Sequence, residues 1–76
     1  MRTLNIFAGR HAAPNARRLT TVHSNTMQGA MSEARSHAGS LIRAYNLDGV
    51  AVRDVLGGLR LDVYVDGEGK VIWKET

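Results

Sequence analysis

Hydrophobic residues repeat with two different periods along this chain, and the changes of period divide it into strands and one helix. From Met27 to Tyr45 apolar residues recur at the 3.6-residue spacing of one face of an α-helix. The apolar stripe consists of Met27, Ala30, Met31, Ala34, Ala38, Leu41, Ile42 and Tyr45. Because several of these side chains are small, we expect the helix to lie close to the surface that it covers.

Both ends of the predicted helix carry capping residues. Asn25 is a good N-cap with Gln28 as its capping-box partner, although Ser24 and Thr26 are N-cap residues of the same kind. At the other end, Asn46 tolerates the left-handed conformation, which lets Leu47 fold back on the last turn.

Two predicted strands precede the helix and three follow it. Segments 3–9 and 18–24 are rich in β-formers, although the inward face of the second is not defined by its pattern. The later strands are predicted at 50–55, 59–65 and 70–74. Glycines at both of their connections favour tight hairpins, because glycine readily adopts positive φ.

The last hairpin has a predicted register. If Gly67 to Gly69 form a three-residue loop with Gly69 at its bulge, Val65 pairs with Val71 and Val63 with Trp73. The apolar residues then share one face. The opposite face carries Arg60, Asp62, Tyr64, Lys70, Ile72 and Lys74.

The element order β-β-α-β-β-β predicts an α+β fold. We expect residues 1–76 to form a single two-layer domain, in which one amphipathic helix crosses one face of an antiparallel sheet of about five strands. Its open face and its loops are therefore the surfaces that remain for function.

Composition excludes several classes of site. The chain has no cysteine, so it has no disulfide framework, no thiolate zinc site and no cysteine nucleophile. Its formal net charge of +3 favours acidic partners but is small for a dedicated nucleic-acid binder. The sequence shows neither a secretory leader nor an apolar run of membrane-spanning length, and we expect a soluble intracellular protein that does not engage a membrane.

No motif predicts catalysis. The three histidines lack a metal-ligand spacing, and Gly-Glu-Gly-Lys at 67–70 lacks the spacing and the trailing hydroxyl residue of a phosphate-binding loop. We therefore expect no catalytic residue, no metal, no cofactor and no enzyme activity.

Two surfaces are candidate binding sites. In the segment RHAAPNARR, at 10–18, Arg10, Arg17 and Arg18 converge if the flanking strands pair as a hairpin. The competing interpretation is solvated charge that protects a sheet edge. On the polar sheet face, Arg60 and Tyr64 are residue types that interfaces favour, and Ile72 and charges such as Lys74 lie beside them, although such a composition is also common on ordinary solvent faces.

The outer helix face is unusual because it is nearly bare of long charged side chains. It carries Gly29, Ser32, Ser36, Gly39 and Ser40. Each exposed helical glycine costs about 1 kcal/mol relative to alanine, so either another part of a chain approaches closely or the cost is simply tolerated.

A Ser/Ala-rich helix containing SEARSHA and a final hairpin of the form V-D-G-x-G-K-V-I-W resemble the small anti-CRISPR proteins of phages and mobile elements. The resemblance is to type I CRISPR inhibitors built from a short antiparallel sheet and one helix. It implies a non-enzymatic inhibitor in the bacterial cytoplasm that binds a protein subunit of the type I surveillance complex, Cascade, with fixed stoichiometry. Such binding would block the complex from its target DNA.

This chain departs from the acidic DNA mimics in that family, because its net charge is positive. Contact with an acidic or mixed protein surface is therefore the expectation, with a monomer or a weak homodimer as the acting species. The alternative is a small basic nucleic-acid-binding or regulatory domain. The expected partner contacts are Arg10, Arg17, Arg18, Arg60, Tyr64 and Lys74.

Overall fold

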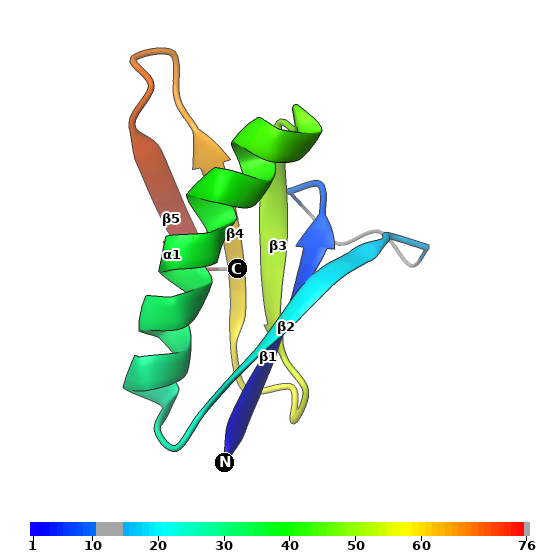
Figure 1. The fold of residues 1–76 in the computed structure, drawn as a ribbon, viewed down its shortest axis with the longest axis vertical. Coiled ribbons are helices and arrows are strands. Elements are labelled where there is room, and N and C mark those ends of the chain that lie inside the picture. Colours follow the sequence, from blue (N-terminus) through cyan, green and yellow to red (C-terminus); the bar gives the residue numbers. More distant parts are fainter. Residues whose placement is uncertain (11–14, 76) are drawn as a thin grey trace.

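A computed structural model describes residues 1–10 and 15–75, and its strands and helix follow the predicted order (Figure 1). The elements are β1 (Arg2–Ala8), β2 (Arg18–Ser24), α1 (Met27–Tyr45), β3 (Gly49–Asp54), β4 (Arg60–Val65) and β5 (Val71–Glu75). The described residues therefore confirm the α+β class, with each strand bound within one residue of the predicted one.

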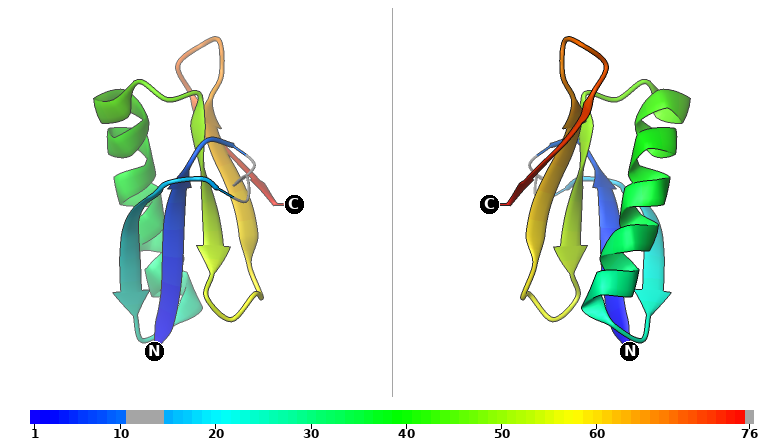
Figure 2. Two further views of the ribbon diagram at one scale, coloured as in Figure 1. Left: turned by 90° about the vertical axis from the view of Figure 1, so that its right-hand side faces the viewer. Right: turned by 90° about the vertical axis from the view of Figure 1, so that its left-hand side faces the viewer.

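The sheet has the strand order β2-β1-β3-β4-β5, and every neighbouring pair is antiparallel. The β1–β2 hairpin and the three-stranded β3–β4–β5 meander are joined through the pairing of β1 with β3. Helix α1 connects β2 to β3 and lies on one face of the sheet (Figure 2). The other face is not covered by the helix. Every second residue of each strand points to it, and these residues include most of the candidate contacts.

The helix begins and ends with local hydrogen bonds. Thr26, and not Asn25, is the N-cap: its hydroxyl oxygen accepts a hydrogen bond from the Gly29 amide at 3.0 Å. Asn46 has the predicted left-handed conformation, with φ of 54°. The Leu47 amide then donates to the Ile42 carbonyl at 2.9 Å, as expected for a chain that folds back on the last turn.

The core forms between the small residues of α1 and the apolar face of the sheet. Buried members are Leu4, Ile6, Val22, Ala30, Ala34, Ala38, Ile42, Val50, Val52, Leu61 and Val63. The three alanines are completely inaccessible to solvent, which agrees with a helix lying close to the strands. Tyr45 departs from the predicted stripe and is 51% exposed.

The β4–β5 hairpin has the predicted register, with Val65 opposite Val71 and Val63 opposite Trp73. Gly69 has φ of +82°, as its bulge position requires. The Asp66 carboxylate stabilises the loop by accepting hydrogen bonds from the amides of Glu68 and Lys70, each at 2.9 Å.

Only one glycine on the outer helix face has a packing reason. A Cβ atom at Gly29 would collide with the side chain of Ser24, which approaches from the end of β2. A Cβ atom at Gly39 would meet only the flexible Arg43 side chain, at 3.5 Å. Close approach therefore explains Gly29 but not Gly39.

Ile42→Ala is expected to lower the free energy of unfolding by about 2–4 kcal/mol, because it opens a cavity beneath the helix. Chemical denaturation measures the loss. Ser36→Ala, on the exposed side of the same helix, should change stability by no more than about 0.5 kcal/mol. Equal losses in the two variants would contradict this assignment of the helix faces.

Gly39→Ala should stabilise the protein by about 0.5–1 kcal/mol, since alanine has the higher helix propensity and the site has room for a methyl group. The same denaturation experiment on Gly29→Ala should show no such gain. A gain at both positions would mean that Ser24 does not restrict Gly29.

Candidate functional site

Half of the ten lysine and arginine side chains lie on the sheet face that α1 leaves uncovered. One continuous row crosses all five strands: Arg18, Phe7, Ala51, Asp62 and Lys74. A second row pairs Thr21, Asn5, Arg53 and Arg60. These rows alternate with the buried residues that face the helix, so they lie on the opposite side of the sheet.

We define the basic sheet face by its charged members. Among the described residues these are Arg10, Arg18, Arg53, Arg60 and Lys74, with Asp62 as the carboxylate. Five positive charges against one negative charge leave an excess of four. Because the formal net charge of the chain is +3, the rest of the chain carries an excess of one negative charge. The positive charge of this protein is therefore segregated on one face.

Arg10 lies flat on this face because an aromatic ring supports it. Its guanidinium carbon is 3.6 Å from the centroid of the Tyr64 ring, within the range of a cation–π contact. The side chain passes over Gly49, where a Cβ atom would lie 2.6 Å from Arg10 Cγ and 2.6 Å from the Val63 carbonyl oxygen. Only glycine at position 49 leaves room for this arrangement.

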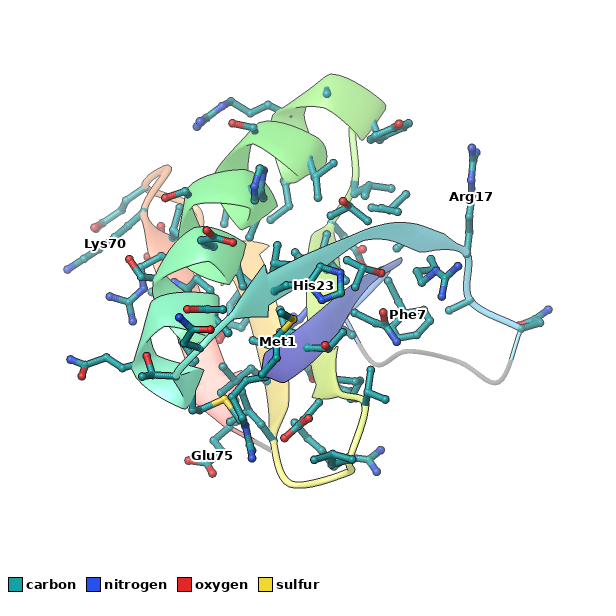
Figure 3. All side chains as sticks on the ribbon, turned by 60° about the horizontal axis from the view of Figure 1, so that its bottom comes forward. Met1, Phe7, Arg17, His23, Lys70 and Glu75 are labelled. Atoms are coloured by element: carbon teal, nitrogen blue, oxygen red, sulfur yellow. The ribbon has the colours of Figure 1, made fainter. Side chains whose placement is uncertain are left out.

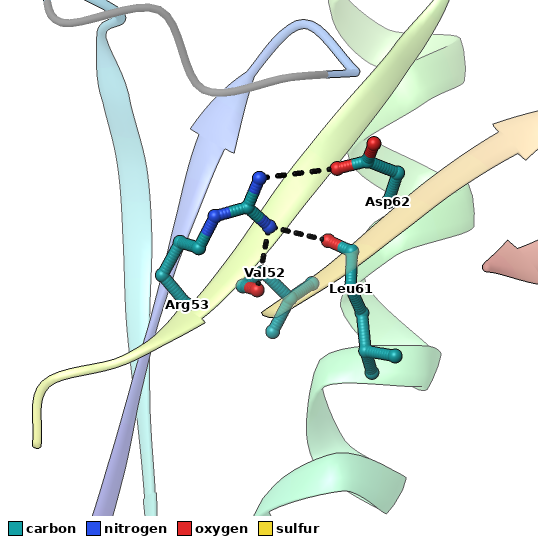
Figure 4. A network of polar contacts seen from close by, with 4 residues as sticks. All are labelled: Val52, Arg53, Leu61 and Asp62. Atoms are coloured by element: carbon teal, nitrogen blue, oxygen red, sulfur yellow. Dashed lines mark hydrogen bonds and ion pairs between the residues drawn. The ribbon is translucent and has the colours of Figure 1, made fainter. Parts of the chain in front are cut away.

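Arg53 has a different role on the same face, because its two Nη atoms donate within the sheet (Figure 4). Its Nη1 donates to the carbonyl oxygens of Val52 at 3.0 Å and Leu61 at 2.8 Å, and its Nη2 donates to Asp62 Oδ1 at 3.2 Å. The Asp62 side chain is only 2% exposed and that of Arg53 is 14% exposed. Arg53 therefore links β3 to β4 and supports the surface around it.

The structure places the six predicted contacts in two groups. Tyr64 lies beneath Arg10, and Arg60 and Lys74 are exposed on the same two strands, β4 and β5. Arg18 shares the face but lies at the β2 edge, opposite Phe7. With strands about 4.8 Å apart, four spacings put Arg18 about 19 Å from Lys74 across the sheet.

Arg17 does not join Arg10. The strands β1 and β2 do pair as a hairpin, and the Arg17 carbonyl accepts a hydrogen bond from the Ala8 amide at 2.9 Å. However, Arg10 extends to β4, with β1 and β3 between it and β2. The exposed Arg17 side chain points away from the sheet (Figure 3). The remainder of the predicted loop, residues 11–14, lies outside the described residues.

Sequence reasoning did not assign Phe7 or Arg53 to this site. In the sequence, Phe7 alternates with the apolar Leu4 and Ile6, which places it on the opposite face of the strand. Arg53 is a charged residue within a mostly hydrophobic strand. Their position beside Asp62 follows from the pairing of β1 with β3 and of β3 with β4.

Residues 1–10 and 15–75 contain no group of three or more histidine, aspartate or glutamate side chains placed to hold a metal ion. Within the same residues, α1 is too polar to span a bilayer. A separate groove on the helix side is lined by Met27, Gln28, Met31, Ser32 and Arg35. Arg35 lies 4.9 Å above the Trp73 ring, so this groove also borders β5.

Comparison with protein-family models, with curated proteins and with solved structures gives no match for this chain.

Arg53→Met should lower the free energy of unfolding by about 2–4 kcal/mol, because it removes three hydrogen bonds and the cation beside the buried Asp62. Thermal or chemical denaturation measures this loss. Arg60→Met is the matched control: Arg60 lies directly opposite Arg53 in the register but is exposed, and its loss should stay within about 0.5 kcal/mol. Similar losses in both variants would contradict a structural role specific to Arg53.

Proposed function

We propose that this protein is a non-enzymatic binding protein that docks on an acidic protein surface through its basic sheet face. The observation that supports this proposal is the segregation of charge: an excess of four positive charges lies on one sheet face of a chain whose formal net charge is +3. Such a field attracts an acidic partner and orients the protein as it approaches.

The chemistry of the face favours a protein partner. Arginine and tyrosine are enriched at the energetically dominant positions of protein interfaces, and Phe7 and Ile72 add partly buried apolar surface beside them. A guanidinium held flat on Tyr64 loses little side-chain freedom on binding and can present two parallel donors to a carboxylate. Tyr64 thus preorganises Arg10 for an acidic side chain.

The proposed partner is a protein subunit of a type I CRISPR surveillance complex, and the proposed outcome is stoichiometric inhibition of target-DNA binding in the bacterial cytoplasm. This step rests on the resemblance of the helix and the final hairpin to small anti-CRISPR proteins. The positive face adds a constraint on that partner, because the surface that it contacts must carry carboxylates.

Binding to nucleic acid is the second candidate, and the same charge excess favours it, since phosphates are attracted without any sequence preference. Two features argue for the protein partner instead. Base-stacking sheets need open aromatic rings, but Arg10 covers Tyr64. Trp73 lies on the helix side and packs against the core, which leaves Phe7 as the one uncovered ring among the described residues of this face.

Charge reversal on the face tests the proposal. Arg60→Glu with Lys74→Glu should weaken inhibition of target-DNA binding by a purified type I surveillance complex at least tenfold. Arg17→Glu with Arg43→Glu changes the net charge by the same amount at exposed positions outside the face, and it should leave inhibition within about threefold of the parent, as expected for charges remote from the contact. Inhibition is measured as the protein concentration that halves DNA binding.

Equal effects of the two double variants would contradict a contact on the basic sheet face. Titration of the protein into a single-stranded oligonucleotide at two salt concentrations tests the second candidate. Tight binding with a steep loss at the higher salt, together with no effect on the surveillance complex, would replace the protein partner by nucleic acid.

A further inference from the structure

The two edges of the sheet differ in their protection against pairing with another strand. The β5 edge strand, Val71–Glu75, is short and carries Lys74 and Glu75, the kind of charge that discourages edge-to-edge contact. The β2 edge strand, Arg18–Ser24, is longer and carries its formal charge only at Arg18. Its segment 20–24, Thr-Thr-Val-His-Ser, carries no charge when His23 is neutral, and it contains three β-branched residues in succession.

The hydrogen-bond pattern of β1 shows which groups of β2 point outward. Thr3 and Gly9 bond toward β3 and its flanking turn, through Val55 and Gly49, whereas Ala8 bonds toward β2 through the Arg17 carbonyl. Odd-numbered residues of β1 therefore pair their backbone groups with β3. In an antiparallel ladder, the β2 residues opposite them, Thr21 and His23, direct their N–H and C=O groups to the free edge.

Segment 20–24 is also regular, which makes it suitable as a template. The irregularity in the β1–β2 register lies between Ile6 and Phe7, where β2 passes from Thr20 to Arg18. The residues from Thr20 onward pair one to one with β1. The outward groups of Thr21 and His23 thus have the spacing of an undistorted strand.

We propose that two copies of this chain associate through β2, in an antiparallel pair centred on Val22. In this register Thr21 of one copy lies opposite His23 of the other, and Thr20 lies opposite Ser24. The outward groups of Thr21 and His23 then form four backbone hydrogen bonds across the two-fold axis. Like charges do not meet anywhere in the paired segment.

The apolar side of the segment also fits a second copy. Val22 is 4% exposed, lies on the helix side of the sheet and belongs to the core. In the proposed pair it directly faces Val22 of the second copy, in a pair without backbone hydrogen bonds between the two residues. A two-fold axis perpendicular to the sheet keeps both helices on one side and both basic sheet faces on the other. The dimer therefore presents two copies of the proposed contact surface side by side.

Sedimentation equilibrium of the full chain tests the pairing. Addition of a single edge strand makes a smaller interface than a standard stable complex, so the apparent mass should rise from 8.3 kDa toward twice that value between about 10 µM and about 1 mM. A protein that stays at 8.3 kDa over this range overturns the proposal.

Two charge variants of the same positions test the register. Thr21→Lys with His23→Lys places like charges opposite each other twice, and it should remain monomeric. Thr21→Lys with His23→Glu places opposite charges at the same two contacts, and it should associate at least as well as the parent. Both variants lose the Thr21–Asn5 and Thr3–His23 side-chain hydrogen bonds equally, and circular dichroism confirms that both are folded.

The results separate this inference from the proposed function. Self-association of the Lys/Lys variant, or loss of association in both variants, would overturn the β2 pairing. Neither result bears on inhibition through Arg60 and Lys74, because these residues lie on β4 and β5, toward the opposite edge of the sheet from β2.

Discussion

The pairing of β1 with β3 is the contact on which the rest of this structure depends. It joins the β1–β2 hairpin to the β3–β4–β5 meander, which α1 separates in the chain. It also aligns Phe7 with Ala51 and Leu4 with Asp54. The second of these alignments brings the buried Asp54 carboxylate to Arg2, at 2.8 Å, where it also accepts a hydrogen bond from the Leu56 amide at 3.0 Å. The same carboxylate thus holds the end of β1 and the β3–β4 turn.

The opposite end of this pairing builds the candidate site. The Gly9 amide donates to the Gly49 carbonyl at 3.0 Å, which brings the chain that follows β1 next to β3. From there Arg10 passes over Gly49 and reaches Tyr64 on β4. A glycine, an arginine and a tyrosine from three parts of the sequence are thus combined into one rigid feature.

Segregation of charge follows from the two-layer architecture. One sheet face is covered by α1, and the charged strand residues on that side, Arg2, Asp54 and Glu75, lie at strand ends. The other charged strand residues, Arg18, Arg53, Arg60, Asp62 and Lys74, lie on the opposite face. There the single buried carboxylate is bonded to Arg53, while Arg60 and Lys74 stay exposed. A modest net charge of +3 is in this way concentrated on one surface. The net charge of the chain therefore understates the electrostatic potential at this face.

What the sequence determined by itself is local. The helix bounds, the left-handed Asn46 and the β4–β5 register follow from residues within a few positions of one another, and the structure confirms them. The choice of Thr26 over Asn25 as N-cap and the exposure of Tyr45 did not follow from the local pattern. The strand order, the Arg10–Tyr64 contact and the Arg53–Asp62 bond belong to the tertiary structure alone. A period of two or 3.6 residues shows which side of an element is buried, but not which strand lies beside it. That choice depends on the summed packing of residues far apart in the chain.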